Sequence, residues 1–241
     1  MLGRLSNRIQ QTKARTMTGL FVSKLFWGQL VTYTLDLIFP PQCAGCGRID
    51  THWCDNCQRE VVEQPLPPIQ NAPFPLSGIA SVGIHKGKLR KAVQALKYDN
   101  ERSLAQYPLG ALLFTRLESL DWTIDTIIPV PLHTNRYRKR GYNQSQLLSE
   151  ALAEYAMLPV ITHALYRNRD TPPQVGLDSH ERQRNVSGAF AANPYLVHQK
   201  NILLLDDVYT TGATMRACAE ALTAAGAHQI YGLTVTVAEP N

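Results

Sequence analysis

Long apolar runs, widely spread cysteines and a secretory signal are all missing from this sequence of 241 residues. No apolar stretch reaches the roughly 18 residues that a membrane-spanning helix needs. Four of the five cysteines lie within residues 43–57, and this clustering excludes a framework of disulfides distributed over the chain. Together these absences predict a protein of the reducing cytoplasm.

Acidic residues are scarce at the start of the chain. The formal net charge is +5, yet residues 1–40 carry five basic residues against Asp36 alone, which leaves the other 201 residues at only +1. This near-neutral remainder argues against a strong electrostatic grip on nucleic acid. With 44% hydrophobic and 18% charged residues, the chain has a globular composition, and its length suits one α/β domain with a small appendage.

Residues 1–39 are interpreted as a basic, amphipathic leader. Residues 1–16 contain no acidic residue and resemble a transit peptide in composition; alternatively, translation starts at Met17. Apolar residues then recur at helical spacing, at Leu20, Phe21, Leu25, Phe26 and Leu30. Such a stripe fits a packed helix or a helix on a membrane surface, and packing is its commoner use.

Residues 40–63 form a predicted zinc-binding module. Its four cysteines are Cys43, Cys46, Cys54 and Cys57. Two pairs of thiolates joined by a short loop can close a tetrahedron around Zn²⁺. Four protein ligands leave no open coordination position, so we predict structural zinc, with iron or a redox pair as alternatives. His52 lies between the two pairs and could serve as a spare ligand.

A proline-rich linker over 64–77 precedes a domain over 78–241 in which strands and helices alternate. Strands are predicted over 79–84, 126–130, 158–166, 201–207 and 231–237, and helices over 89–96, 103–120, 143–155 and 215–222. The alternation predicts a mainly parallel sheet flanked by helices. We expect a basic loop over 136–140 and a capping pair of Asn143 with Gln146. Cys218 is expected to be a buried small hydrophobe.

The segment from Ile202 to Thr214 carries the strongest functional signal. Four aliphatic residues run directly into Asp206 and Asp207, and a small, hydroxyl-rich loop leads into the next helix. Parallel sheets bind ligands at the carboxyl ends of their strands, helix N-termini bind phosphate, and Gly212 permits close approach of the backbone. Adjacent carboxylates beside a phosphate need hydroxyl donors or a cation, such as a ribose diol or Mg²⁺. The pattern predicts a phosphosugar site; an acidic strand end with a capped turn is the simpler alternative.

This segment resembles the thirteen-residue signature with which type I phosphoribosyltransferases bind 5-phosphoribosyl 1-pyrophosphate (PRPP). The resemblance implies a type I phosphoribosyltransferase-like α/β fold, with the ribose hydroxyls bound by Asp206 and Asp207. It implies that the 5-phosphate is bound by Tyr209, Thr210, Thr211, Gly212, Ala213 and Thr214. Residues 128–133, 140–144, 171–174 and 181–190 resemble the ComF family of competence-related proteins, in which a four-cysteine module ahead of the domain is typical.

In a phosphoribosyl transfer, negative charge accumulates on the departing pyrophosphate and must be stabilised by cations. The cations directly after the predicted strand 126–130 resemble the family's pyrophosphate loop: Arg136, Arg138, Lys139 and Arg140. Arg140 is a candidate catalytic residue together with the acidic pair. The polar stretch 168–188 resembles the family's mobile lid, from which Arg182 and Arg184 would reach the phosphates. Both basic clusters could instead simply face solvent, and for Lys97 a surface role is favoured.

The leading hypothesis is therefore an enzyme that transfers phosphoribosyl from PRPP, with Mg²⁺, to an unidentified nitrogen acceptor. The second is a non-catalytic PRPP- or nucleotide-binding protein that handles single-stranded DNA with other DNA-uptake proteins, because the ComF family is associated with natural transformation. A third hypothesis, a zinc-stabilised interaction module, leaves the pattern from Asp206 to Thr214 unexplained.

Overall fold

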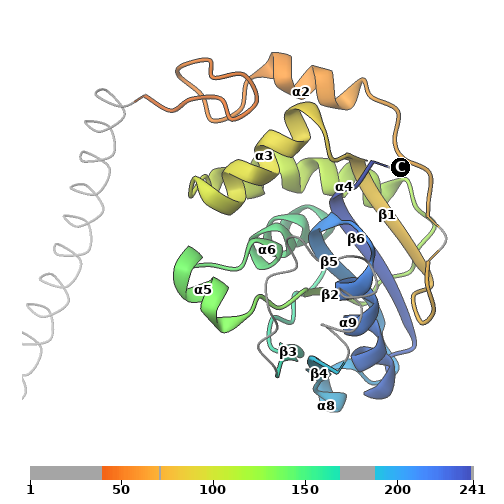
Figure 1. Ribbon diagram of the computed structural model, residues 1–241. Helices are drawn as coiled ribbons and strands as arrows, with labels where there is room; N and C mark the ends of the chain where they lie inside the picture. Colours follow the sequence, from red (N-terminus) through yellow and green to blue (C-terminus); the bar gives the residue numbers. More distant parts are fainter. Residues whose placement is uncertain (1–39, 71, 169–187, 240–241) are drawn as a thin grey trace, which may run out of the picture. The chain divides into compact units, whose positions relative to one another are not determined.

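A computed structural model describes residues 40–70, 72–168 and 188–239 (Figure 1). The chain divides into two units, Met1–Gln42 with Arg48–Thr51 and Cys43–Gly47 with His52–Asn241. In the first unit, Gln42 and Ile49 form an antiparallel bridge, and the Asp50 amide donates to the Pro41 carbonyl at 2.9 Å. All elements named below belong to the second unit.

Strands and helices alternate along most of this unit. The strands are β1 (Gly78–Ile84), β2 (Thr126–Pro129), β3 (Leu165–Arg167), β4 (Phe190–Ala192), β5 (Asn201–Tyr209) and β6 (Gln229–Val237). The helices are α2 (Asp55–Val62), α3 (Gly87–Tyr98), the π-helical segment η1 (Ala105–Gly110), α4 (Ala111–Glu118), α5 (Thr134–Arg140), α6 (Gln144–Ala156), α8 (Pro194–Val197) and α9 (Ala213–Ala224). In the described part of the chain, every helix is too short or too polar to span a bilayer.

The main sheet has four parallel strands in the order β1-β6-β5-β2. Beside it, β3 and β4 pair as an antiparallel ribbon. The central strand β5 is buried on both faces, as its unbroken aliphatic run predicts. Leu203 and Leu205 belong to a core with α3, α4 and α6, whereas Ile202 and Leu204 belong to a second core with α9 (Figure 1). The predicted parallel sheet flanked by helices is confirmed.

Several local predictions were wrong. The segment 158–166 does not form one strand: Val160 makes a single bridge to Ile127, and β3 starts only at Leu165. The strand β5 runs two residues past the predicted end at 207, because pairing with β6 continues to Tyr209 and Val237. The boundaries proposed for the module, the linker and the domain remain a prediction.

The expected basic loop over 136–140 is in fact helix α5. The residues that cap the two ends of this helix were not recognised in the sequence. At its start, the His133 ring nitrogen Nδ1 accepts the Asn135 amide at 3.1 Å, and at its end Gly141 takes a left-handed φ of +80°. Asn143 caps the next helix by accepting the Ser145 amide at 3.1 Å. Gln146 does not complete a capping box, because its side chain donates to Glu150 at 2.8 Å.

Candidate functional site

The acidic pair lies near the carboxyl end of β5, where ligands of parallel sheets bind. Successive side chains of a strand point to opposite faces, so the two carboxylates meet different partners. Asp206 is partly exposed, and its Oδ1 accepts a hydrogen bond from Ser145 Oγ at 2.8 Å and from the Asp207 amide at 2.9 Å. Ser145, at the start of α6, carried no recognisable signal in the sequence, because only the folded chain brings it to Asp206.

Asp207 is only 4% exposed and faces a cation. Lys97 Nζ lies 2.7 Å from Asp207 Oδ1, so a residue favoured for the surface is instead part of the candidate site. The other oxygen, Oδ2, is buried and has no hydrogen-bond partner among the described residues. Buried acceptors are normally satisfied, and this one is chemically suited to a ligand hydroxyl or to a divalent cation such as Mg²⁺.

The electrostatics of the pair favour a bound ligand. Burial and the neighbouring Asp207 carboxylate raise the pKa of Asp206 to about 7, against the opposing effects of the Ser145 hydroxyl, Lys97 and the Asp207 amide. A raised pKa means that the ionised carboxylate is disfavoured where it stands. A cation or hydroxyl donors at the pair would stabilise the ionised form.

The predicted phosphate-binding residues form the turn between β5 and α9. Gly212 takes a left-handed φ of +74°, and a Cβ at this position would overlap the Tyr209 hydroxyl. Helix α9 begins at Ala213, so its N-terminal end, where the helix dipole is positive, lies next to this turn. Thr210 and Thr211 are exposed there. The turn has the shape and the donors that an anionic group requires.

The predicted pyrophosphate cations lie on α5. Arg136, Arg138 and Lys139 are exposed. Arg140 donates to Gln144, and its guanidinium lies over the Tyr98 ring, 5.6 Å from the ring centroid. Tyr98 directly follows Lys97, which pairs with Asp207. The structure therefore brings Arg140 to the same end of α3 as Lys97. Arg182 and Arg184 lie outside the described residues.

His85 is a polar residue at this edge that the sequence analysis missed. It directly follows β1, and its Nδ1 lies 2.8 Å from Thr236 Oγ1 on β6. Burial lowers the pKa of His85, and the nearby charges of Lys97 and Arg90 lower it as well. The rule used for β5, that polar residues at the carboxyl ends of strands gather at one edge, would have found it.

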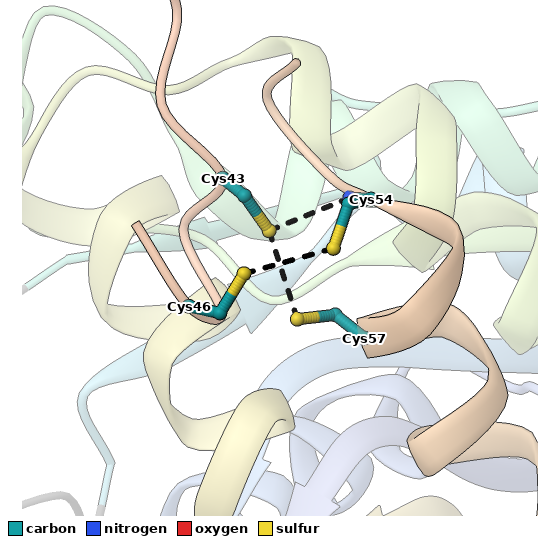
Figure 2. Close-up of side chains that lie close together, drawn as sticks. All are labelled: Cys43, Cys46, Cys54 and Cys57. Atoms are coloured by element: carbon teal, nitrogen blue, oxygen red, sulfur yellow. Dashed lines mark hydrogen bonds between the residues drawn. The ribbon is translucent and has the colours of Figure 1, made fainter. Parts of the chain in front are cut away.

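A second cluster is formed by the four cysteines, whose sulfur atoms point toward one another (Figure 2). The Sγ–Sγ distances are 3.7 Å for Cys43 with Cys57 and 3.7 Å for Cys46 with Cys54, and all four atoms lie within 4.8 Å of one another. A tetrahedron with Zn–S bonds of 2.3 Å has edges of about 3.8 Å, whereas a disulfide requires about 2.05 Å. The four cysteines are therefore placed to bind a metal ion.

The backbone around the cluster prepares it for an anionic sulfur. Burial opposes ionisation of Cys43, but the amides of Cys54, Cys46 and Gly45 donate to its thiolate and bring its pKa down to about 6. Burial raises the pKa of Cys57, the most enclosed sulfur. A Cβ on Gly45 would lie 2.6 Å from Cys57 Sγ, so glycine is needed there. The suggested spare ligand, His52, pairs with Glu101 at 2.7 Å.

Comparisons with known proteins agree with this geometry. Residues 109–240 match the family model of the phosphoribosyl transferase domain. Competence protein F of Haemophilus influenzae is 27% identical over 202 residues, which cover 80% of this chain and 84% of that protein. DNA utilization protein YhgH of Escherichia coli O157:H7 is 30% identical over 191 residues, 77% of this chain and 84% of that protein. The chain belongs to the ComF family.

This membership confirms the family and the type I phosphoribosyltransferase-like fold predicted from the sequence. A further ComF relative, competence protein ComFC of Bacillus subtilis, is 32% identical over 97 residues, 40% of this chain and 37% of that protein. Among solved structures, glutamine PRPP amidotransferase from B. subtilis aligns with a TM-score of 0.38 and 22% identity over 54% of this chain and 26% of that one.

Proposed function

We propose that this protein binds PRPP together with Mg²⁺ at the carboxyl edge of β5 and transfers its phosphoribosyl group to a nitrogen acceptor. The observation that carries the proposal is the continuous path from the buried acidic pair to the N-terminus of α9. The buried Oδ2 of Asp207, for which the described part of the chain offers no hydrogen-bond partner, supports a hydroxyl or cation ligand at that point. The left-handed turn at Gly212 supports binding of the anionic 5-phosphate next to the acidic pair.

In this proposal each group of PRPP has a partner. Asp206 and Asp207 accept hydrogen bonds from the 2′- and 3′-hydroxyls, and the turn from Tyr209 to Thr214 donates to the 5-phosphate. The exposed cations of α5 and Arg140 receive the pyrophosphate. Bound Mg²⁺, held by the acidic pair and the ligand oxygens, would neutralise charge on the phosphates.

The reaction itself is a substitution at C1 of the ribose. The bond from C1 to the pyrophosphate oxygen breaks, and its electron pair leaves with pyrophosphate. The lone pair of the acceptor nitrogen forms the new C1–N bond, and the displaced N–H proton passes to solvent. The side chains contribute by fixing the ribose through its diol and by stabilising the charge that develops on the leaving group.

The four cysteines are proposed to hold structural zinc. Sulfur separations that match a zinc tetrahedron, together with four protein ligands, support a closed site. Such thiolates persist in a reducing compartment, which supports a cytoplasmic location.

The test of PRPP binding is a thermal-unfolding experiment with zinc-loaded protein. We expect PRPP with Mg²⁺ to raise the Tm, and we expect the shift to vanish in the double variant Asp206→Asn with Asp207→Asn. Asp121→Asn, the same change at an exposed site, is the matched control. An unshifted Tm for the native protein would reject PRPP binding. Pyrophosphate release with a panel of bases and amines then tests catalysis.

A second function is favoured by one surface feature. Alongside the exposed cations of α5, Tyr137 is 49% exposed and Tyr98 is 74% exposed. Cations interleaved with exposed aromatic rings are typical of single-stranded nucleic-acid surfaces. The names of the relatives, competence and DNA utilization proteins, point the same way, so we propose single-stranded DNA as an alternative ligand. The protein would then bind PRPP or a nucleotide without transferring its phosphoribosyl group.

Binding of single-stranded DNA is measured by fluorescence anisotropy over a range of salt concentrations. We expect the affinity to fall with salt, and replacement of Arg136, Arg138 and Lys139 by Gln to reduce the salt slope by about two, since each phosphate contact contributes about 0.7. Binding that the triple replacement leaves unchanged would exclude this surface. Pyrophosphate release with an acceptor would favour the enzyme.

A further inference from the structure

Helix α3 contacts the cysteine module along its first turns. Lys91 Nζ donates to the Gly45 carbonyl, between the first two cysteines, at 3.1 Å. Lys88 Nζ lies 3.6 Å from Glu60 Oε2 on α2, the helix that carries Cys57. The N-terminal half of α3 therefore contacts both the segment between the first two cysteines and the helix that carries Cys57.

The module also reaches past the other end of α3. His52 Nδ1 lies 2.7 Å from Glu101 Oε2, three residues beyond Tyr98, where the helix ends. Buried residues of the module share one apolar core with the inner side of α3; they are Cys43, Trp53, Cys54, Cys57 and Val61 on one side and Leu89, Val93 and Leu96 on the other. Contacts along the helix and beyond its end fix its position along its own axis.

The last turn of α3 faces the candidate PRPP site. Lys97 pairs with Asp207 at 2.7 Å, and the Tyr142 hydroxyl donates to the Leu96 carbonyl. Arg140 lies over the Tyr98 ring. Three successive residues of α3 thus contact the turn between α5 and α6, the acidic strand β5 and helix α5.

We propose that the metal-loaded cysteine module positions α3, and through it Lys97, so that metal binding and PRPP–Mg²⁺ binding are thermodynamically linked. This inference rests on the proposed function. A structural metal contributes folding free energy directly to the segments that ligate it. A charge-assisted contact of 2.7 Å is lost when one partner moves by about 1 Å, so a small displacement of α3 is enough to separate Lys97 from Asp207.

Thermodynamic linkage acts equally in both directions. If the metal tightens PRPP–Mg²⁺ binding by some factor, PRPP–Mg²⁺ must tighten metal binding by the same factor. A module that served only general stability would lower the Tm when emptied and leave the affinity of the remaining folded protein for PRPP unchanged. The two roles are therefore separable by experiment.

The first experiment removes polar contacts of the module with α3 and the residues after it, and leaves the four metal ligands intact. In the full chain, Lys91→Met with His52→Ala removes two polar contacts but no cysteine. We expect one bound zinc by elemental analysis and an approximately tenfold higher Kd for PRPP–Mg²⁺ by calorimetry, equivalent to about 1.4 kcal/mol. Lys86→Met is the matched control, because Lys86 pairs with Glu239 and not with the module. Unchanged affinity in a zinc-loaded double variant would overturn the proposal.

The second experiment reads the position of Lys97 without PRPP. Acetylation of each lysine is followed by mass spectrometry, with the exposed Lys86 as internal reference. We expect Lys97 to be acetylated at least five times faster in the double variant than in the native protein. Equal rates would overturn the positioning role. Faster acetylation in a protein that shows no PRPP binding at all would support positioning and reject the proposed function instead.

Discussion

Replacing Asp206 by Asn should stabilise the protein in the absence of ligand, although it removes a proposed binding group. The carboxamide oxygen of Asn can still accept the bonds that Oδ1 receives from Ser145 and from the Asp207 amide. What disappears is a negative charge that stands beside Asp207 in a partly buried place. A site built for a ligand commonly sacrifices stability in this way.

The size of the effect follows from the pKa of Asp206, which is raised from 3.8 to about 7. Between these values the folded state binds more protons than the unfolded state, so this group makes stability fall as pH rises. The advantage of Asp206→Asn over the native protein should therefore grow by about 1.4 kcal/mol per pH unit between pH 4 and pH 7. From pH 5 to pH 7 that is about 2–3 kcal/mol, or a relative rise in Tm on the order of 5–10 °C.

The assay is calorimetric unfolding of zinc-loaded protein at pH 5, 6, 7 and 8, without PRPP, Mg²⁺ or chelator. The difference in Tm between variant and native protein should increase up to pH 7 and then level off. Asp121→Asn provides the baseline for the same chemical change at an exposed site. A difference that stays constant with pH, or that shrinks toward pH 8, would refute the electrostatic reasoning.

Two further variants test the loop and the cysteine centre. Gly212→Ala combines a left-handed φ of +74° with overlap of the Tyr209 hydroxyl; we expect a loss of about 1–3 kcal/mol and of the PRPP-induced Tm shift. Gly87→Ala, with a φ of +52° and open space around the Cβ, should lose stability only. Cys57→Ser should abolish zinc binding in elemental analysis, whereas Cys218→Ser, on the buried face of α9, should lower the Tm with zinc retained; retained zinc in Cys57→Ser would exclude the four-sulfur site.

The central part of the fold could be predicted because its signals are local. The run from Ile202 to Leu205 is aliphatic at every position, which is typical of a strand covered on both faces, and the structure places it at the centre of the sheet. The paired cysteine spacing likewise predicted a cluster that the structure assembles. In both cases neighbouring residues in the sequence carry the whole pattern.

Other features depend on partners that are remote in the sequence. Lys97 looked like a surface residue because its partner, Asp207, lies 110 positions away and meets it only across the helix–sheet contact. Ser145 reaches Asp206 across 61 positions. Residues 136–140 were predicted to be a loop because the four cations among the seven residues of α5 suggested solvent exposure rather than a capped helix. Its caps, His133 and Gly141, act through geometry that composition does not reveal.

The near-neutral charge of residues 41–241 is a weaker argument against phosphate ligands than the sequence alone suggested. A bound phosphate responds to charges within a Debye length of roughly 8–10 Å, not to the net charge of a domain. Four cations lie together on α5. One of them, Arg140, lies over the ring of Tyr98, at the end of α3 that also carries Lys97. Pyrophosphate in the first proposed function and the DNA backbone in the second would both bind to these cations. The two ligands would therefore compete, and substitutions on α5 weaken both, whereas substitutions of the acidic pair weaken PRPP alone.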